Sequence, residues 1–340
     1  MTVELKLGTR KSKLALIQAN LVKDLIESQH ENVTVSIVGM STAGDRDVNT
    51  SLYTLGGSDK GLWTKELENA LLDNSVDMIV HSLKDVQSQL PDGCILGAFP
   101  IRADPTDALV VKEGLPFRTL DDLPDGSTVG TSSIRRVAQL RKSYPKLKFM
   151  DVRGNLDTRL AKLDDPNGQY IALILASAGL KRFSHEHSKR ITCTLKSPTL
   201  LHAVGQGSLG IEIRENDEKI LNYLKPINCI KTQLAVTVER ALLRTLEGGC
   251  SAPVGVETNV KEISDNNTYN IHFKANLTTL DGSQQIEECQ EKSIQNILNA
   301  DQFGVEIANI IISKGGGQIL KDIHNNKSNQ IINKTNIVSN

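Results

Sequence analysis

Short apolar runs alternate with segments of helical period along the first 200 residues of the chain. The first apolar runs that have the length of strands are 3–8, 33–40, 76–82, 95–99 and 108–111. Between the first two of these runs, leucine and isoleucine recur at the spacing of one helix face, and Ser12 stands where it can cap that helix. A second helix is expected over 65–74. This order predicts a mostly parallel sheet that helices cover on both faces.

A proline-rich stretch between Pro100 and Pro124 marks a boundary, after which the same pattern restarts. The second unit has expected strands at 127–130, 147–152 and 171–176 and expected helices at 134–144 and 156–163. The alternation of short strands and helices changes near Lys225. From there we expect a helix capped by Thr232, strands around 269–277 and 284–290, and a last helix that starts near Asp301 and stops at 315–317.

The fold class predicted from this pattern is α/β, with two doubly wound α/β domains that flank a cleft and a smaller α+β domain at the C-terminus. We expect the first domain to comprise residues 1–104 and 205–224, and the second to comprise residues 105–204. The third domain is expected over 225–324, followed by a flexible tail over 325–340.

Composition narrows the classes of function. The net charge is −1 and aromatic residues make up only 4%, which argues against a nucleic acid or an anionic membrane surface as partner. No secretory signal is visible, and the longest apolar stretch is about half of a membrane span. The odd number of cysteines, with no C-x-x-C pair, favours free thiols in the cytoplasm over disulfides or structural zinc. No metal site is expected, since His185-Glu186-His187 lacks companion ligands.

One segment departs from this balance of charge. Residues 131–162 contain nine Lys or Arg against two Asp, a net charge of +7. The lysines are equally well explained as a solvated face, but the arginines fall at expected strand ends, where forked guanidinium groups suit carboxylates or phosphates. Ser132 and Ser133 end a strand and open a helix, which is a favourable place for an anion. Arg10 also follows a strand directly.

Three further motifs carry candidate chemistry. Lys84 and Asp85 follow a strand, where the lysine could form a Schiff base, hold an anion or act with the aspartate as an acid/base pair, or where both could belong to a solvated turn. The segment 205–210 fits G-x-G-x-x-G, but a helix-like stretch precedes it and a strand-like one follows, so a tight interdomain turn is expected. Cys250 follows two glycines that can present the thiol, and no histidine stands beside it.

Together these segments resemble the porphobilinogen deaminase (hydroxymethylbilane synthase) family over nearly the whole chain. The matching stretches, in order, are LGTRKSKLAL, GLWTKELENALL, VHSLKDV, DPTDALV, VGTSSIRRVAQL, VRGNLDTRL, ILASAGLKR, AVGQGSLGIE and LEGGCSAPVG. The resemblance implies a cytoplasmic, monomeric transferase of haem and tetrapyrrole biosynthesis, with a fold like that of periplasmic binding proteins. It would condense four porphobilinogen molecules into the linear tetrapyrrole hydroxymethylbilane and release four molecules of ammonia.

The resemblance also assigns roles to residues. Cys250 would carry a dipyrromethane cofactor through a thioether bond, and Asp85 would be the catalytic carboxylate. The side chains that would hold the cofactor are those of Lys84, Ser133, Arg135, Arg136 and Arg153. Those that would hold the substrate are Arg10, Ser12, Arg159 and Arg182. Lys60 and Lys65 would be basic positions in or beside a lid over about 50–62, and Gln206 would lie between domains.

Two other hypotheses stay open on the residues alone. A non-catalytic module that binds a small polyanion would also place arginines at the strand ends of two α/β lobes. An enzyme that forms a Schiff base through Lys84 is the second alternative.

Overall fold

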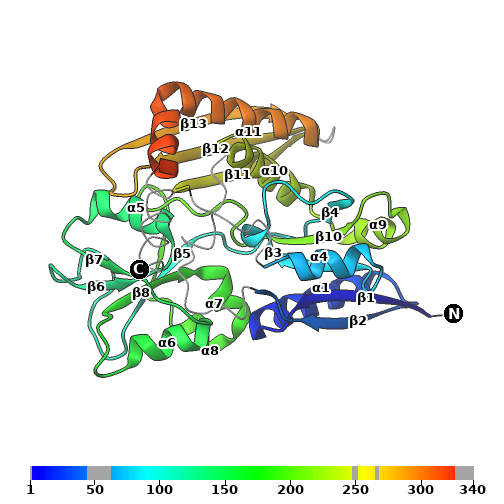
Figure 1. The fold of residues 1–340 in the computed structure, drawn as a ribbon, viewed down its shortest axis with the longest axis horizontal. Helices are drawn as coiled ribbons and strands as arrows, with labels where there is room; N and C mark the ends of the chain where they lie inside the picture. Colours follow the sequence, from blue (N-terminus) through cyan, green and yellow to red (C-terminus); the bar gives the residue numbers. More distant parts are fainter. Residues whose placement is uncertain (1, 44–62, 247–251, 265–267, 326–340) are drawn as a thin grey trace, which may run out of the picture.

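Three β-sheets, each with its own helices, organise the chain (Figure 1). The structure is a computed structural model, and it describes residues 2–43, 63–246, 252–264 and 268–325. In Figure 1 the two five-stranded sheets lie side by side, and the three-stranded sheet with its two long helices lies above them. The predicted fold class, two α/β units and a smaller α+β unit, is confirmed.

The first sheet has the strand order β2-β1-β3-β10-β4. Its strands are β1 (Val3–Arg10), β2 (Val33–Met40), β3 (Met78–Ser82), β4 (Cys94–Ala98) and β10 (Leu209–Arg214). Its helices are α1 (Lys13–Gln29), α4 (Lys65–Leu72), α9 (Glu218–Leu224) and the 3-10 turns η1 (Leu83–Asp85) and η2 (Lys225–Ile227). β10, which the chain adds on its return from the second sheet, is antiparallel to both of its neighbours, so the other four strands share one direction.

The second sheet repeats this plan in the order β7-β6-β8-β5-β9. Its strands are β5 (Asp107–Val111), β6 (Thr128–Gly130), β7 (Lys148–Met150), β8 (Ala172–Ala176) and β9 (Cys193–Leu195). Its helices are α5 (Ile134–Ser143), α6 (Leu156–Asp164), α7 (Ser177–Phe183) and α8 (His185–Lys189). Here β5 is the strand that runs against its neighbours. The two α/β units contact each other directly, because α1 packs against α7.

The third sheet is antiparallel and has the order β11-β12-β13. Its elements are α10 (Ile230–Thr245), β11 (Val254–Ser264), β12 (Thr268–Thr278), β13 (Gln285–Ile294), α11 (Ile297–Ile311) and the π-helical turn η4 (Ile312–Gly316). Phe273 of β12 and Phe303 of α11 pack edge to face in its core with ring centroids 6.2 Å apart. Strand β11 is absent from the sequence-based prediction.

Several predicted boundaries are wrong. Helix α10 begins at Ile230 with Cys229 as its N-cap, and the Thr232 hydroxyl accepts a hydrogen bond from the backbone N–H of Arg102 instead of capping the helix. The last helix begins at Ile297, where Asn296 caps it through the N–H of Asn299. Its glycines do not end it, since residues 317–325 are helical again. Residues 326–340 of the predicted tail lie outside the described residues.

The turn at 205–208 joins the two α/β units to each other. Gly205 and Gly207 have φ angles of 70° and 85°, and a Cβ on Gly207 would lie 2.5 Å from the carbonyl oxygen of Ala103. The N–H of Ala103 donates to the carbonyl of Gly207 at 3.2 Å, and the N–H of Leu83 donates to that of Ser208 at 3.0 Å. The segment is therefore a tight turn, as expected, although the described residues 197–204 before it contain no helix.

Candidate active site

The exposed carboxylate of Asp85 lies at the end of a buried strand. Strand β3 is buried along most of its length and ends at Ser82, and the 3-10 turn η1 then carries Lys84 and Asp85 out of the sheet. The 205–208 turn packs against the backbone of Leu83 and Lys84 and so holds η1 in place. Lys84 is half-buried, whereas the Asp85 side chain faces solvent.

A cavity of about 80 Å³ opens beside Asp85 at the carboxyl ends of β1 and β3. Arg10, Ser12 and Asp85 line it together with Trp63 and His81. The Arg10 guanidinium lies over the Trp63 ring at 4.2 Å, which fixes the charged group by a cation–π contact. Ser12 caps α1 by accepting a hydrogen bond from the N–H of Ala15, as predicted. The cavity therefore combines cationic, hydroxyl and carboxylate groups.

Cations of the second unit surround Lys84 and Asp85. Burial lowers the pKa of Lys84, Asp85 and Asp107 oppose this shift, and the positive charges of Arg136 and Arg135 add to it. Burial likewise lowers the pKa of Arg159, to about 10; Arg136 and Arg153 add to this shift, whereas Asp151 and Asp85 oppose it. Because burial is the main cause in both cases, an anionic ligand would stabilise these cations.

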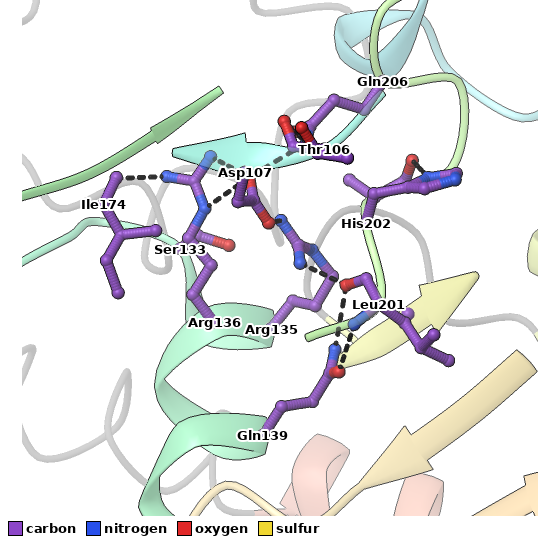
Figure 2. A network of polar contacts seen from close by, with 12 residues as sticks. Thr106, Asp107, Ser133, Arg135, Arg136, Gln139, Ile174, Leu201, His202 and Gln206 are labelled. Carbon is purple, nitrogen blue, oxygen red and sulfur yellow. Dashed lines mark hydrogen bonds and ion pairs between the residues drawn. The ribbon is translucent and has the colours of Figure 1, made fainter. Parts of the chain in front are cut away.

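Two arginines of helix α5 are instead paired inside the protein, as Figure 2 shows. Arg135 and Arg136 are 4% and 6% exposed and both donate to the fully buried Asp107, at 2.8 Å and 2.7 Å. Gln206 donates to the same carboxylate at 2.9 Å. Burial alone would raise the pKa of Asp107, but Arg135 and Arg136 hold it far below its usual range. Nη1 of Arg135 also donates to the carbonyl of Leu201, and Nη1 of Arg136 donates to that of Ile174.

A second buried ion pair joins the third unit to the segments where the chain passes between the two α/β units. Arg102 donates to both carboxylate oxygens of Glu239 on α10, at 2.6 Å and 3.1 Å, and to the carbonyl of Gln206. The same carboxylate accepts hydrogen bonds from the N–H of Gly205 and from the hydroxyl of Thr258. Glu239 thus fixes the 205–208 turn, which in turn supports Lys84 and Asp85.

Comparison with known proteins identifies the family. The model described as "Porphobilinogen deaminase, dipyromethane cofactor binding domain" matches residues 5–222, and "Porphobilinogen deaminase, C-terminal domain" matches residues 233–313. The chain belongs to the porphobilinogen deaminase family. A porphobilinogen deaminase of Yarrowia lipolytica is 47% identical over 93% of this chain and 92% of its own length, and one of Saccharomyces cerevisiae is 46% identical over 94% and 97%.

Other relatives and solved structures show further similarity. A porphobilinogen deaminase of Prochlorococcus marinus is 43% identical over 94% of this chain and 97% of its own length. Among solved structures, the Methionine Binding Protein MetQ shares 15% identity with a TM-score of 0.37, covering 66% of this chain and 88% of that one. As a member of its family, the chain is a transferase of tetrapyrrole biosynthesis that makes hydroxymethylbilane from porphobilinogen and carries a dipyrromethane cofactor.

The structure brings most of the predicted site residues together. Charge–charge effects on the pKa values of Lys84 and Arg159 link six of them across the two α/β units: Lys84, Asp85, Arg135, Arg136, Arg153 and Arg159. Arg182 lies at the crossover, where it donates to the carbonyl of Gly207 at 2.7 Å. Ser133 is the N-cap of α5, and Lys65 is exposed at the start of α4. Cys250 and Lys60, with the predicted lid over 50–62, lie outside the described residues.

Sequence reasoning missed the carboxylates that hold this arrangement in place. Asp107, Glu212 and Glu239 are all fully buried. Glu212 interrupts the apolar strand LGIEIR, and Asp107 opens the apolar run DALVV. A charged residue inside an apolar strand is a usable signal, because burial of a carboxylate requires a partner. Glu239 gives a weaker signal, since it lies beside the apolar face of a helix.

Proposed function

We propose that condensation of porphobilinogen takes place at Asp85 and that the surrounding cations hold the acetate and propionate groups of the pyrroles. The observation that carries this proposal is the gathering of partly buried cations near Asp85, since burial lowers the pKa of both Lys84 and Arg159. Cations in a partly buried place are costly unless anions join them. Each porphobilinogen ring brings two carboxylates, so ring binding would relieve this cost.

The described residues fit the dipyrromethane cofactor. Lys84, Ser133, Arg135, Arg136 and Arg153 would hold its carboxylates, and Cys250 would bind it through a thioether bond. One donor of Arg135, its Nε, is buried and has no hydrogen-bond partner among the described residues. When bound, the cofactor supplies the ring to which the first porphobilinogen is joined.

Substrate binding is assigned to the cavity and its rim. Arg10 and Ser12 line the cavity with Asp85, and Arg159 contributes positive charge from the second unit. Arg182 is held at the crossover between the units. We assign Lys60 and Lys65 to the basic margin of the site.

Asp85 then serves the chemical step through its charge. Loss of ammonia from porphobilinogen leaves a positively charged pyrrole, and a fixed carboxylate that accepts the pyrrole N–H stabilises that charge. Because η1 is supported by the 205–208 turn, the carboxylate needs little rearrangement when the charge develops. Lys84 beside it would keep the substrate's carboxylates away from Asp85.

Mass analysis of the intact protein tests the cofactor assignment. The purified chain should carry the mass of a dipyrrole, and Cys250→Ser should fold but lack this mass and turnover. A dipyrrole retained by Cys250→Ser would refute the tether. A borohydride-trapped imine at Lys84 would favour the Schiff-base alternative, for which the lowered pKa of Lys84 is the supporting observation.

The remaining assignments concern organisation. We propose domains at 1–104 with 205–224, at 105–204 and at 225–324, which agrees with the membership of β10 in the first sheet. We also propose a monomer in the cytoplasm that needs neither metal nor nucleic acid. The four described cysteines are free thiols, which suits a reducing compartment. Among the described residues no helix is both long and apolar enough to cross a membrane, and no group of three ligands is placed to hold a metal ion.

A further inference from the structure

Three ionisable side chains are buried directly behind the cavity of Asp85. They are Glu68 of α4, His81 of β3 and Glu212 of β10, which are 6%, 6% and 0% exposed. A hydrogen bond of 2.8 Å joins Nε2 of His81 to Oε2 of Glu212. The antiparallel pairing of β3 with β10 brings these two side chains together in the sheet. We call these three residues the Glu68–His81–Glu212 cluster.

In the described part of the chain, two buried carboxylate oxygens of the cluster lack a hydrogen-bond donor. Oε1 of Glu68 and Oε1 of Glu212 are buried and have no hydrogen-bond partner among the described residues. Burial raises the pKa of Glu68; the Thr64 hydroxyl opposes this shift, the charge of Glu212 adds to it, and the charge of His81 opposes it. Cys94 of β4 also faces Glu212, but burial raises its pKa to about 12, so it stays a neutral thiol. A buried carboxylate oxygen without a hydrogen-bond donor is costly, so among the residues described these oxygens lack the partner that burial calls for.

His81 connects this cluster to the reaction site. It lines the same cavity as Asp85 and Arg10, and only three residues separate it from Asp85 along the chain. Since Nε2 is engaged by Glu212, Nδ1 is the ring nitrogen that remains for proton exchange with the cavity. An imidazole oriented by a buried carboxylate is a recurrent arrangement for a general base.

We propose that His81, supported by Glu212 and Glu68, accepts the proton that each condensation releases. This inference rests on the proposed role of Asp85. When the methylene–nitrogen bond of a porphobilinogen breaks, the electron pair leaves with nitrogen as ammonia. The methylene carbon then bonds to a hydrogen-bearing ring carbon of the neighbouring pyrrole. The C–H bond at that carbon breaks, its electron pair restores the aromatic ring, and the proton goes to Nδ1 of His81.

Asp85 and the Glu68–His81–Glu212 cluster are suited to different steps, because their environments differ. Asp85 must stay ionised to stabilise the positive pyrrole, so it is poorly suited to take up the proton in the same cycle. The cluster is shielded from solvent and can pass the proton from His81 toward the Glu212 carboxylate. The proton finally leaves to solvent, where ammonia takes it up.

The test uses porphobilinogen that carries deuterium at its free ring carbon. In purified holoenzyme, His81→Gln should turn over on the order of 10²-fold more slowly than wild type, the scale of a lost general base. Deuterium should slow His81→Gln several-fold more than it slows wild type, because C–H cleavage becomes rate-limiting. Glu212→Gln keeps the shape of its side chain and should also enlarge the isotope effect. His202→Gln is the matched control, since His202 is equally buried, 6% exposed, but lies at the domain junction. It should keep the wild-type isotope effect.

Single-turnover ammonia release separates this inference from the proposed function. His81→Gln should release the first ammonia at the wild-type rate, whereas Asp85→Asn should not. Slow turnover of both His81→Gln and Glu212→Gln with a wild-type isotope effect would overturn the proton-acceptor role and leave the role of Asp85 intact. Wild-type ammonia release by Asp85→Asn would refute the role of Asp85 itself.

Discussion

Asp107 and Asp85 both act on the charge of Lys84, yet one is fully buried and the other is exposed. Asp107 is saturated with protein donors, since two arginines and Gln206 bind its oxygens. Asp85 lines an open cavity instead. The same residue type, beside cations of the same segment, is therefore enclosed by protein donors in one place and open to a cavity in the other.

The cationic side chains of the basic segment 131–162 lie in three different environments. Arg135 and Arg136 are buried and share the single carboxylate of Asp107, which offsets only part of their positive charge within the protein. Arg159 is disfavoured chiefly by burial, and two arginines and two aspartates act on its charge in opposite directions. Lys146, by contrast, is exposed and pairs with Asp125 at the surface. A high local charge in the sequence thus has three separate physical consequences.

Removal of the buried carboxylate should have the largest effect. Asp107→Asn leaves two buried guanidinium groups without their anion, and breaking such a pair typically costs about 3–5 kcal/mol. Urea unfolding of the variant should show a loss of this size. Asp125→Asn, which removes an exposed carboxylate, should unfold like wild type. Equal stability of wild type and Asp107→Asn would refute the structural role of this network.

The same network predicts the pH dependence of stability. The pKa of Asp107 is depressed in the folded state, so its contribution is present above its unfolded pKa, about 4, and is lost as pH falls toward the folded value. Wild type should therefore lose stability in acid more steeply than Asp107→Asn. Unfolding midpoints measured from neutral pH down to about pH 3 would check this difference.

Removal of the exposed carboxylate should change activity and leave stability intact. Asp85→Asn keeps the shape of the side chain but removes the negative charge, and loss of such electrostatic stabilisation typically lowers turnover about 10²–10³-fold. Its unfolding free energy should stay within about 0.5 kcal/mol of wild type, as for other surface substitutions. Asp85→Glu, which keeps the charge, should retain part of the activity. A stability loss as large as that of Asp107→Asn would end the contrast between the two carboxylates.

Arg159 should show the opposite balance of stability and activity from Asp107. Arg159→Leu removes a cation that burial disfavours, so the protein without cofactor should be at least as stable as wild type. Turnover should fall at least about tenfold, because a charge-assisted hydrogen bond to a carboxylate contributes about 1.5–3 kcal/mol. Arg159→Lys, which keeps the charge, should lose less of the turnover. Calorimetry combined with steady-state rates would separate the two effects, and a drop in stability alone would make Arg159 a structural residue.

The sequence was sufficient for the elements whose patterns are local. The helix that Ser12 caps and the strand that leads to Asp85 were both predicted, because apolar period and cap chemistry are written in adjacent residues. Helix α10 was misplaced because Thr232 bonds to Arg102, far away in the sequence. The sequence also did not predict which residues pair with the buried charges. Nothing local indicates that Asp107 pairs with Arg135 and Arg136, or that Glu239 pairs with Arg102.

The smallest effect is expected from the lysines on the surface of the basic segment. Lys146 and Lys148 are both exposed, and the ion pair of Lys146 with Asp125 has both side chains in solvent. Such pairs contribute little to folding, and their fields are screened within about 10 Å at 0.1 M salt. The double variant Lys146→Gln/Lys148→Gln should therefore keep the wild-type melting temperature, cofactor mass and kcat. Any change in kcat/KM should stay below about twofold at low salt and vanish at high salt, since only long-range attraction of the anionic substrate is affected. A large loss that persisted at high salt would mean that these lysines touch the substrate, and the division of the segment by burial would then be wrong.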